Sequence, residues 1–176
     1  MKLEELEIPG VLLAHPVQHE DPRGWFMEIL REEELRTRFV QSNHSHSQMN
    51  VLRGLHYHAK QADAWYVVNG TCRVGLADLR GTPDSLKVLT VEMAADEHLL
   101  VYIPPGVAHG FYAVTELDLV YWVTHAYDNS DEFSVLWNDP TLGVPWGTTS
   151  PILSARDREA PPLSWDTVKK VLGGSG

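Results

Sequence analysis

The sequence predicts an all-β fold, a jelly-roll sandwich or barrel with one or two short helices. Most segments alternate between apolar and polar residues with a period of two, which is typical of strands with one buried face. Gly, Pro, Asn and Asp residues separate these segments into about ten short strands at roughly 8–12-residue spacing, as in sandwiches and barrels. The jelly roll is the variety that most often encloses a small-molecule site in its mouth.

The predicted strands follow from this alternation. Leu117, Leu119, Tyr121 and Val123 form the clearest example, because every second residue is apolar and therefore points to one face of a sheet. Asn69-Gly70 is the dipeptide of a two-residue hairpin and predicts that the strands on either side pair with each other. The ten predicted strands are Gly10–Val17, Gly24–Leu30, Val51–His58, Trp65–Val68, Cys72–Leu79, Leu86–Val91, Leu99–Ile103, Phe111–Val114, Leu117–Ala126 and Phe133–Trp137.

Two helices complete the predicted elements. Arg31–Arg38 is rich in Glu, Leu and Arg, which are good helix formers, and Trp165–Leu172 is expected to form a second helix. The chain of 176 residues contains no internal repeat and no linker, only a Pro-rich stretch over residues 139–162. Because domains have roughly 100–200 residues, we expect residues 1–176 to form a single domain.

Composition and charge exclude several classes of protein. Hydrophobic residues make up 43% of the chain and charged residues 22%, which are globular values and exclude a disordered or collagen-like chain. The formal net charge of -10 argues against a basic nucleic-acid-binding face. The single cysteine, Cys72, cannot form an internal disulfide, the first residues are too acidic for a signal peptide, and no apolar run approaches roughly 20 residues. We expect a cytoplasmic protein that binds neither nucleic acid nor a membrane.

Histidine is dense in one part of the chain. Four of the nine histidines, His44, His46, His56 and His58, fall within 15 positions. Imidazole suits both proton transfer and metal binding near neutral pH, although exposed histidines in a polar loop are the simpler interpretation. His56 and His58 are two residues apart in a predicted strand and should therefore face the same side of the sheet.

Two short motifs include these histidines. The pattern H-x-H-x4-D-x6-G begins at His56 and contains Asp63, and P-x-G-x2-H ends at His109. Together they resemble the two signature motifs of the cupin superfamily, whose metal-binding members hold a divalent ion with such residues. The resemblance implies a candidate metal site of His56, His58, Asp63 and His109. The alternative is a hydrogen bond between His58 and Asp63 in a polar interior.

A longer series of motifs covers most of the chain. It comprises Asp21-Pro22-Arg23-Gly24-Trp25-Phe26-Met27-Glu28, Gln41-Ser42-Asn43-His44-Ser45, Leu52-Arg53-Gly54-Leu55-His56-Tyr57, Ala77-Asp78-Leu79-Arg80, Ile103-Pro104-Pro105-Gly106-Val107-Ala108-His109-Gly110-Phe111, Tyr127, Asp139-Pro140-Thr141-Leu142 and Leu153-Ser154-Ala155-Arg156-Asp157. In this order they resemble landmarks of the dTDP-4-dehydrorhamnose 3,5-epimerase family. The resemblance implies a homodimeric, cupin-like jelly roll that needs no added cofactor. Its implied reaction inverts C3, C5 or both in a dTDP-linked 4-keto-6-deoxyhexose through an enolate.

The resemblance also implies roles for individual residues. His56 matches the family base, Asp157 the carboxylate that orients its imidazole, and Tyr127 the proposed proton donor. The reaction needs such parts, because one proton is removed beside the C4 ketone and another is returned from the opposite face. The residues that the resemblance implies for substrate binding are Arg23, Phe26, Glu28, Gln41, Asn43, Arg53 and His109, with Phe26 and Glu28 on the same wall or on the neighbouring subunit.

One position departs from the family pattern. Asp63 stands where most members carry a Lys close to the ketone, so the usual cation for the enolate is absent, and Lys60 is a candidate substitute. A metal ion could polarise the ketone instead, but a metal-bound His56 could not be a free base. Three hypotheses therefore stay open: an epimerase, a metal-dependent cupin enzyme, and a non-catalytic nucleotide-sugar-binding homologue.

Overall fold

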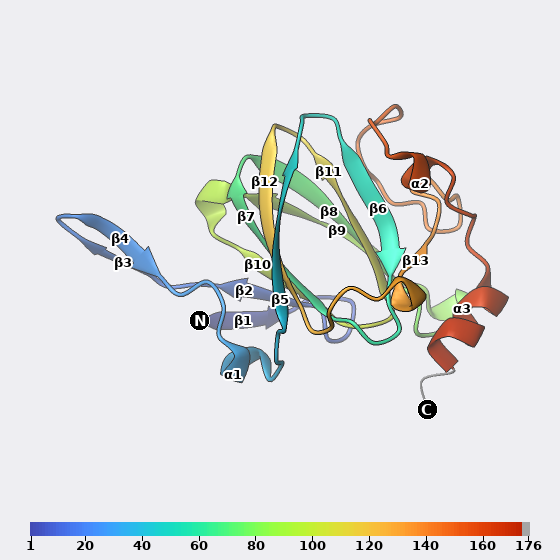
Figure 1. The fold of residues 1–176 in the computed structure, drawn as a ribbon, viewed down its shortest axis with the longest axis horizontal. Helices are drawn as coiled ribbons and strands as arrows, with labels where there is room; N and C mark the ends of the chain where they lie inside the picture. The colour runs from blue at the N-terminus through green and yellow to red at the C-terminus, as the bar shows by residue number, and fades with distance from the viewer. Residues whose placement is uncertain (174–176) are drawn as a thin grey trace.

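The computed structural model describes residues 1–173, and its main body is a sandwich of two sheets (Figure 1). One sheet has six strands, in the order β1 (Lys2–Glu5), β2 (Leu12–His15), β10 (Leu100–Ile103), β7 (Asp63–Asn69), β12 (Leu117–Val123) and β5 (Gln41–Ser47). The other has five, in the order β13 (Phe133–Ser134), β6 (Leu52–Tyr57), β11 (Val107–Ala113), β8 (Thr71–Asp78) and β9 (Val88–Ala94). The predicted all-β jelly-roll class is confirmed, as a sandwich and not a closed barrel.

Apolar residues on the inner faces of the two sheets form the core between them. Leu117, Leu119 and Val123 of β12 are buried, as their alternation predicts, and Leu117 and Leu119 pack in one cluster with Val74 and Leu76 of β8. Full burial of each such side chain stabilises the fold by about 1.5–3 kcal/mol. The sandwich is thereby a rigid frame for the residues that line its open end.

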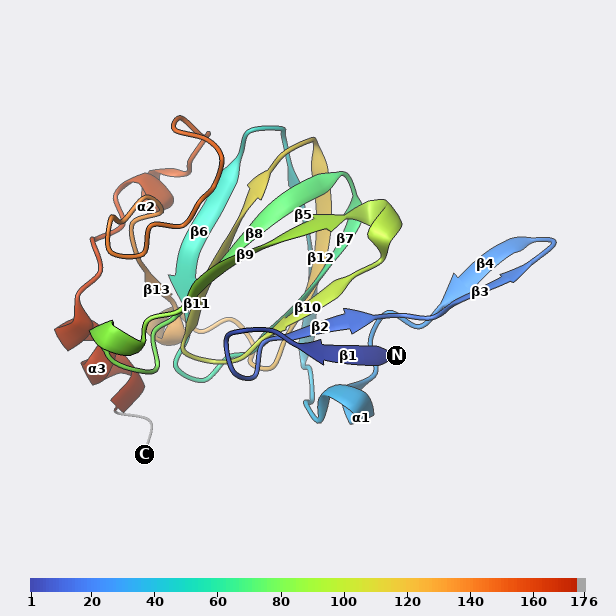
Figure 2. The ribbon, with the colours of Figure 1, turned by 180° about the vertical axis from the view of Figure 1, so that it is seen from behind.

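The outer face of the five-stranded sheet is covered by the C-terminal part of the chain. A second apolar cluster joins Leu52 and Leu55 of β6 to Trp146 and to Val168 of α3 (Trp165–Gly173). Figure 2 shows α3 and α2 (Ala155–Arg158) on this side of the sandwich. This packing brings residues near position 157 back to β6.

A separate hairpin extends away from the sandwich. It consists of β3 (Gln18–Asp21) and β4 (Gly24–Met27), and both ribbon views show it pointing away from the side that carries α3 (Figures 1 and 2). Trp25 and Phe26 on β4 are 55% and 66% exposed. The remaining elements are α1 (Glu32–Leu35) and three 3-10 turns, η1 (Pro83–Ser85), η2 (Ala95–Glu97) and η3 (Asn129–Asp131).

The turn at Asn69-Gly70 lies where the sequence predicts it, but the predicted pairing is wrong. β7 pairs with β10 and β12 in one sheet, whereas β8 pairs with β11 and β9 in the other. The dipeptide is a local signal for a reversal of the chain and carries no information about which strand each arm meets. The chain crosses here from one layer of the sandwich to the other.

Three strands were not predicted, and all three are polar or short. β5 reads Gln-Ser-Asn-His-Ser-His-Ser and has no apolar residue, so it shows no hydrophobic alternation. Its burial nevertheless alternates, because every second side chain faces the space between the sheets. β1 and β3 were missed as well, and the four-residue helix α2 falls in the predicted irregular stretch.

The two predicted helices are both present. α1 is shorter than the predicted Arg31–Arg38, because Arg36 adopts a left-handed conformation that ends the helix. α3 matches its prediction to within one residue. None of the helices within residues 1–173 has the length and apolar character needed to cross a membrane.

Candidate active site

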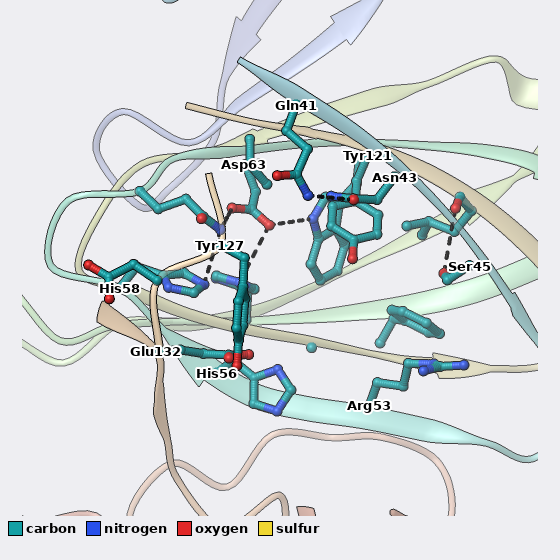
Figure 3. A pocket seen from close by; sticks show the side chains of 18 residues that line it. Gln41, Asn43, Ser45, Arg53, His56, His58, Asp63, Tyr121, Tyr127 and Glu132 are labelled. Atoms are coloured by element: carbon teal, nitrogen blue, oxygen red, sulfur yellow. Dashed lines mark hydrogen bonds and ion pairs between the residues drawn. The ribbon is translucent and has the colours of Figure 1, made fainter. Parts of the chain in front are cut away.

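A cavity of about 380 Å³ opens between the two sheets at one end of the sandwich. Its walls are the inward-facing side chains of β5, β7 and β12 on one side and of β6 and β11 on the other. The lining residues are Gln41, Asn43, Ser45, Arg53, His56, His58, Gln61, Asp63, Trp65, His109, Gly110, Phe111, Leu119, Tyr121, Val123, Tyr127, Asp128 and Glu132. Figure 3 shows His58 and Asp63 toward one end of this cavity and Arg53 toward the other.

His56 and Asp157 form a hydrogen-bonded pair in the wall of the cavity. The Nε2 atom of His56 lies 2.7 Å from Oδ1 of Asp157, and the other carboxylate oxygen accepts a hydrogen bond of 2.9 Å from Ser154 Oγ. Ser154 also caps the N-terminus of α2, which fixes the position of Asp157. The imidazole is thus held by a carboxylate from behind while its ring lines the cavity.

The carboxyl group of Asp157 is buried but remains acidic. Burial alone would raise its pKa, but the hydrogen bond and charge of His56, together with hydrogen bonds from Ser154 and the Gly54 backbone, outweigh burial and lower the pKa below its ordinary value. Asp157 is therefore an anion at neutral pH. An anion at this position stabilises the imidazolium that forms whenever His56 accepts a proton.

Two glycines allow the strands that carry His56 and His109 to approach closely. Gly54 has a φ of +123°, and a Cβ atom at this position would lie 2.7 Å from Cα of Gly110 on β11. Only glycine permits both this conformation and this approach. The pairing register places His109 opposite His56 and then shifts between His109 and Phe111, so the two histidines line the cavity from adjacent strands.

A second group of titratable side chains lies deeper in the cavity. Potential ligand atoms of His58, Asp63 and His109 all lie within 4.8 Å of one another, and the three side chains are buried. Burial lowers the pKa of His109 well below its usual range, and the charge of Asp63 opposes this effect without overcoming it. His56 lies outside this group, so the structure brings together three of the four residues of the alternative metal set that the cupin motifs imply.

The opposite end of the cavity contains a positively charged side chain, that of Arg53. Arg53 donates hydrogen bonds of 3.0 Å to Ser47 Oγ and to the backbone carbonyl of His46. Of the eighteen lining residues named above, Arg53 is the one Lys or Arg. This end can bind an anion through Arg53. Gln41, which donates a hydrogen bond of 2.7 Å to Asn43, lies toward the end that contains Asp63, because its strand partner Val123 also pairs with Asp63 (Figure 3).

Tyr127 lies at the mouth of the cavity. Its side chain is 70% exposed, and its hydroxyl donates a 3.4 Å hydrogen bond to Asn129. Tyr127, His56 and Glu132 all line the cavity and are labelled in Figure 3. An exposed phenol at the mouth can reach a substrate bound there, and it contributes little to the core.

The predicted site residues fall into three groups. Six line the cavity: Gln41, Asn43, Arg53, His56, His109 and Tyr127. Asp157 supports His56 from behind. Arg23, Phe26 and Glu28 belong to the projecting hairpin or follow it, and they do not line the cavity of their own chain. Lys60, the candidate replacement for the family Lys, is exposed and does not line the cavity either.

The dense group of four histidines is divided between two surfaces. His56 and His58 face the cavity, as expected. His44 and His46 point out of the opposite face of β5, where both contact Asp118 at 3.0–3.1 Å. Proximity in sequence did not make one cluster, because residues 44 and 46 alternate with the inward-facing residues 41, 43 and 45 along the same strand.

Several lining residues were not predicted as site residues. Tyr121 is part of the alternating face of β12, and that alternation could have placed it in the cavity. Glu132 pairs with Arg156 at 2.7 Å through one oxygen, whereas its other oxygen, Oε2, is buried and has no hydrogen-bond partner among residues 1–173. Gln61 and Trp65 contact Asp63, and no local pattern marks them.

The fold and the cavity define a class of protein: a jelly-roll sandwich that places a histidine–carboxylate pair in a pocket between its sheets, an arrangement suited to acid–base chemistry. The profile of the dTDP-4-dehydrorhamnose 3,5-epimerase family matches residues 5–164. The dTDP-4-dehydrorhamnose 3,5-epimerase of Salmonella typhimurium is 38% identical over 170 residues, which cover 89% of this chain and 92% of the relative.

Solved structures agree with the sequence comparison. The rmlC epimerase of Mycobacterium tuberculosis superposes with a TM-score of 0.86 at 29% identity, with all of both chains covered. ChmJ, a 3'-monoepimerase from Streptomyces bikiniensis solved in complex with dTDP-quinovose, gives a TM-score of 0.82 at 32% identity, covering 96% of this chain and 89% of ChmJ. The chain belongs to the dTDP-4-dehydrorhamnose 3,5-epimerase family, which confirms the fold and the isomerase class expected from its motifs.

Proposed function

We propose that this protein epimerises a dTDP-linked 4-keto-6-deoxyhexose at C3, C5 or both, with His56 as the base. The observation that carries the proposal is the His56–Asp157 pair in the wall of the cavity, with Nε2 of His56 2.7 Å from the carboxylate. Asp157 occupies one ring nitrogen, which leaves the other to take a proton from the substrate. A positioned acid–base group of this kind typically accelerates proton transfer by about 10²–10⁴-fold.

The return of the proton is assigned to Tyr127. Inversion requires that the proton leave from one face of the sugar and return to the other, so a second group besides His56 is needed. Tyr127 stands on the loop after β12, whereas His56 is on β6, and both line the cavity. In this proposal the Tyr127 hydroxyl donates the returning proton. A solved relative is described as a 3'-monoepimerase, so inversion of one centre is within the range of this fold.

Binding of the nucleotide sugar is divided between the two ends of the cavity. Arg53 would take the diphosphate, since its guanidinium forms paired hydrogen bonds to phosphate oxygens. Gln41, Asn43 and the lining face of His109 would contact neutral groups of the ligand. One arginine is little positive charge for a diphosphate, and this points to a contribution from a second chain.

The second chain is part of the proposal. The β3–β4 hairpin holds Arg23 and Phe26 away from their own cavity, and the open edges β5 and β1 leave room for pairing between subunits. We propose a two-fold homodimer in which the hairpin of each subunit brings Arg23, Phe26 and Glu28 to the cavity of its partner. The unit would be a single domain over residues 1–176 in the cytoplasm, in keeping with its buried, unpaired Cys72.

The reaction is tested by exchange of substrate hydrogen with solvent. The protein is incubated in heavy water with dTDP-4-keto-6-deoxyglucose, and deuterium at C3 and C5 is measured by NMR and mass spectrometry. We expect deuterium at C3, C5 or both. Binding of the nucleotide sugar without exchange at either carbon, with this or any other 4-keto nucleotide sugar, would instead support the non-catalytic homologue.

The dimer is tested by mixing two inactive variants. If Arg23 acts in the partner's cavity, a mixed dimer of His56→Asn and Arg23→Ala has one intact site. Random reassociation of equal amounts should then restore about one quarter of wild-type activity. Activity no higher than the mean of the separate variants, or a mass of 19.8 kDa by light scattering, would contradict the proposed dimer.

A further inference from the structure

The side chain of Tyr127 is not held in place by burial. It is 70% exposed, and its hydroxyl makes a 3.4 Å hydrogen bond to Asn129, which belongs to the same turn. Burial stabilises a side chain in proportion to the apolar surface that it removes from water, and this ring removes little. The position of the Tyr127 hydroxyl therefore depends on the backbone of residues 127–131 and on the contacts that hold this backbone to the sandwich.

Asp131 anchors this turn through its side chain. It is 7% exposed, and its carboxylate accepts hydrogen bonds from three successive backbone N–H groups of the loop after β6. Oδ1 lies 2.8 Å from the nitrogen of Ala59, and Oδ2 lies 3.1 Å and 3.2 Å from those of Lys60 and Gln61. Hydrogen bonds to a charged acceptor are strong, and these three compensate for the burial of the carboxylate.

The backbone of Asp131 is anchored as well. A carbonyl oxygen only accepts, so Nδ1 of His58 donates the hydrogen bond of 2.6 Å to the carbonyl of Asp131. The N–H of Asp131 donates to the carbonyl of Asp128 at 3.0 Å, which closes the turn η3. Asp131 therefore joins the turn that carries Tyr127 to the loop over residues 58–61.

This loop continues directly from the strand that carries the proposed base. His56 is the second-last residue of β6, and the loop over residues 58–61 follows. The chain after Asp131 returns to the same strand, because β13 pairs with β6 so that Ser134 lies opposite His56. Asp131 is thus a direct link between the Tyr127 turn and the end of the His56 strand.

We propose that Asp131 is a positioning residue for proton return: its carboxylate keeps the Tyr127 hydroxyl at a fixed position relative to the His56 imidazole. The inference rests on the proposed function, in which His56 removes a proton and Tyr127 returns one to the other face. A displacement of about 1 Å in such a group can lower a rate by about 100-fold. His56 is held independently by Asp157, so loss of Asp131 should affect the return of the proton more than its removal.

Loss of the anchor changes what happens to the enolate. His56 takes the proton as the C–H bond breaks. In the intact site the O–H bond of Tyr127 then breaks, a C–H bond forms on the opposite face, and solvent reprotonates the phenolate. With Tyr127 displaced, the imidazolium of His56 returns hydrogen to the original face. In heavy water this hydrogen is deuterium, because the imidazolium N–H exchanges with solvent, so deuterium enters without inversion.

The test compares two rates in heavy water with dTDP-4-keto-6-deoxyglucose, the entry of deuterium at C3 and C5 and the formation of inverted sugar. Asp131→Ala should lower the ratio of inversion to deuterium entry by about 10- to 100-fold, while deuterium entry itself changes much less. Asp131→Asn keeps one acceptor oxygen for the loop and should give an intermediate ratio. If the alanine variant does not fold, Asp131→Asn decides, and a wild-type ratio in it overturns the inference.

A second buried aspartate provides the matched control. Asp139 is 2% exposed and also accepts hydrogen bonds from three backbone N–H groups, those of Thr141, Leu142 and Leu163. Asp139→Ala should lower the melting temperature, as Asp131→Ala does, but should leave the ratio of inversion to deuterium entry unchanged. Amide hydrogen exchange in the absence of substrate should become faster at residues 59–61 in Asp131→Ala and stay unchanged there in Asp139→Ala.

Three results would overturn the inference. They are a wild-type ratio in folded Asp131→Ala, an equal fall of the ratio in Asp139→Ala, and unchanged amide exchange at residues 59–61 in Asp131→Ala. Each of them leaves the epimerase reaction in place and removes only the role of Asp131. A wild-type protein with no deuterium at either carbon would instead overturn the proposed function, and this role with it.

Discussion

His56 Nε2 lies 2.7 Å from Asp157 Oδ1 although 101 residues separate the two in the sequence. The imidazole comes from β6 and the carboxylate from α2, which contacts the same strand. Docking of the C-terminal segment therefore completes the candidate acid–base pair.

Replacement of the base should remove most of the reaction and little of the binding. We expect His56→Asn to lower deuterium incorporation at C3 and C5 by about 10²–10⁴-fold. Affinity for the nucleotide sugar, measured by calorimetry, should change little, because Arg53 and not the imidazole is assigned to the phosphates. Unchanged exchange in this variant would remove His56 as the base.

Loss of the orienting carboxylate should have a smaller effect than loss of the base. Asp157→Asn keeps a hydrogen-bonding side chain next to His56 but removes the negative charge that stabilises the imidazolium. We expect a fall in exchange that is clearly less than that of His56→Asn under the same conditions. A loss equal to that of His56→Asn would show that the pair works only as a unit.

The same pair has a predicted effect on stability at low pH. The pKa of Asp157 is lowered in the folded state from an ordinary value of 3.8. Its stabilising contribution is therefore complete above that value and is lost as the pH falls through the lower folded pKa. The difference in melting temperature between wild type and Asp157→Asn should be constant near neutrality and should shrink below about pH 4. A difference that grows on acidification would contradict this.

Tyr127→Phe should separate exchange from inversion. Removal of the hydroxyl leaves the base in place, so at least one carbon should still exchange with solvent while the yield of inverted sugar falls. Because Tyr127 is 70% exposed, the free energy of unfolding should change by no more than about 0.5 kcal/mol. NMR coupling constants of the product report inversion, and full inversion by the variant would exclude this hydroxyl as the donor.

A cation at position 63 should speed removal of the substrate proton in metal-free protein. Asp63→Lys places an ammonium group where the family carries one, and it can stabilise the enolate oxygen. Asp63→Asn is the matched control, since it removes the carboxylate without adding a positive charge. We expect faster deuterium exchange in Asp63→Lys than in Asp63→Asn, both measured after chelator treatment. Equal rates would mean that this position does not act on the ketone.

The single cysteine should be inert in the folded protein. Burial, with a smaller contribution from the charge of Glu92, raises the pKa of Cys72 to about 12 from an ordinary value of 9.0. A disulfide reagent at pH 8 should react with Cys72 only after denaturation. Stability should also fall as the pH rises from about 9 toward 12, because the unfolded thiol ionises there and the folded one does not.

Many of the residues that line the cavity could be predicted from motifs, but the position of the projecting hairpin could not. Gln41, Asn43, Arg53, His56, His109 and Tyr127 line one pocket as the family resemblance implies. By contrast, Arg23, Phe26 and Glu28 lie outside it, because the hairpin that holds them projects from the sandwich (Figure 1). Where a hairpin points depends on what it packs against, and residue types alone carry no such information.

The sequence by itself determined which segments are extended wherever one face of a strand is apolar, since alternation is a local property. The strand over residues 117–123 is an example. The turn at Asn69-Gly70 is marked by a signal that is equally local. It did not reveal β5, whose inner face lines a polar cavity and so lacks the apolar signal.

Only the tertiary structure decided which strands pair and which histidines meet. In the tertiary structure β7 and β8 lie in opposite sheets, and His44 points outward. His56 lies outside the group of His58, Asp63 and His109. The physical reason is that strand pairing and side-chain contact depend on burial and hydrogen bonding between segments far apart in the chain. Local periodicity specifies the face of each residue within its own strand and leaves its partners open.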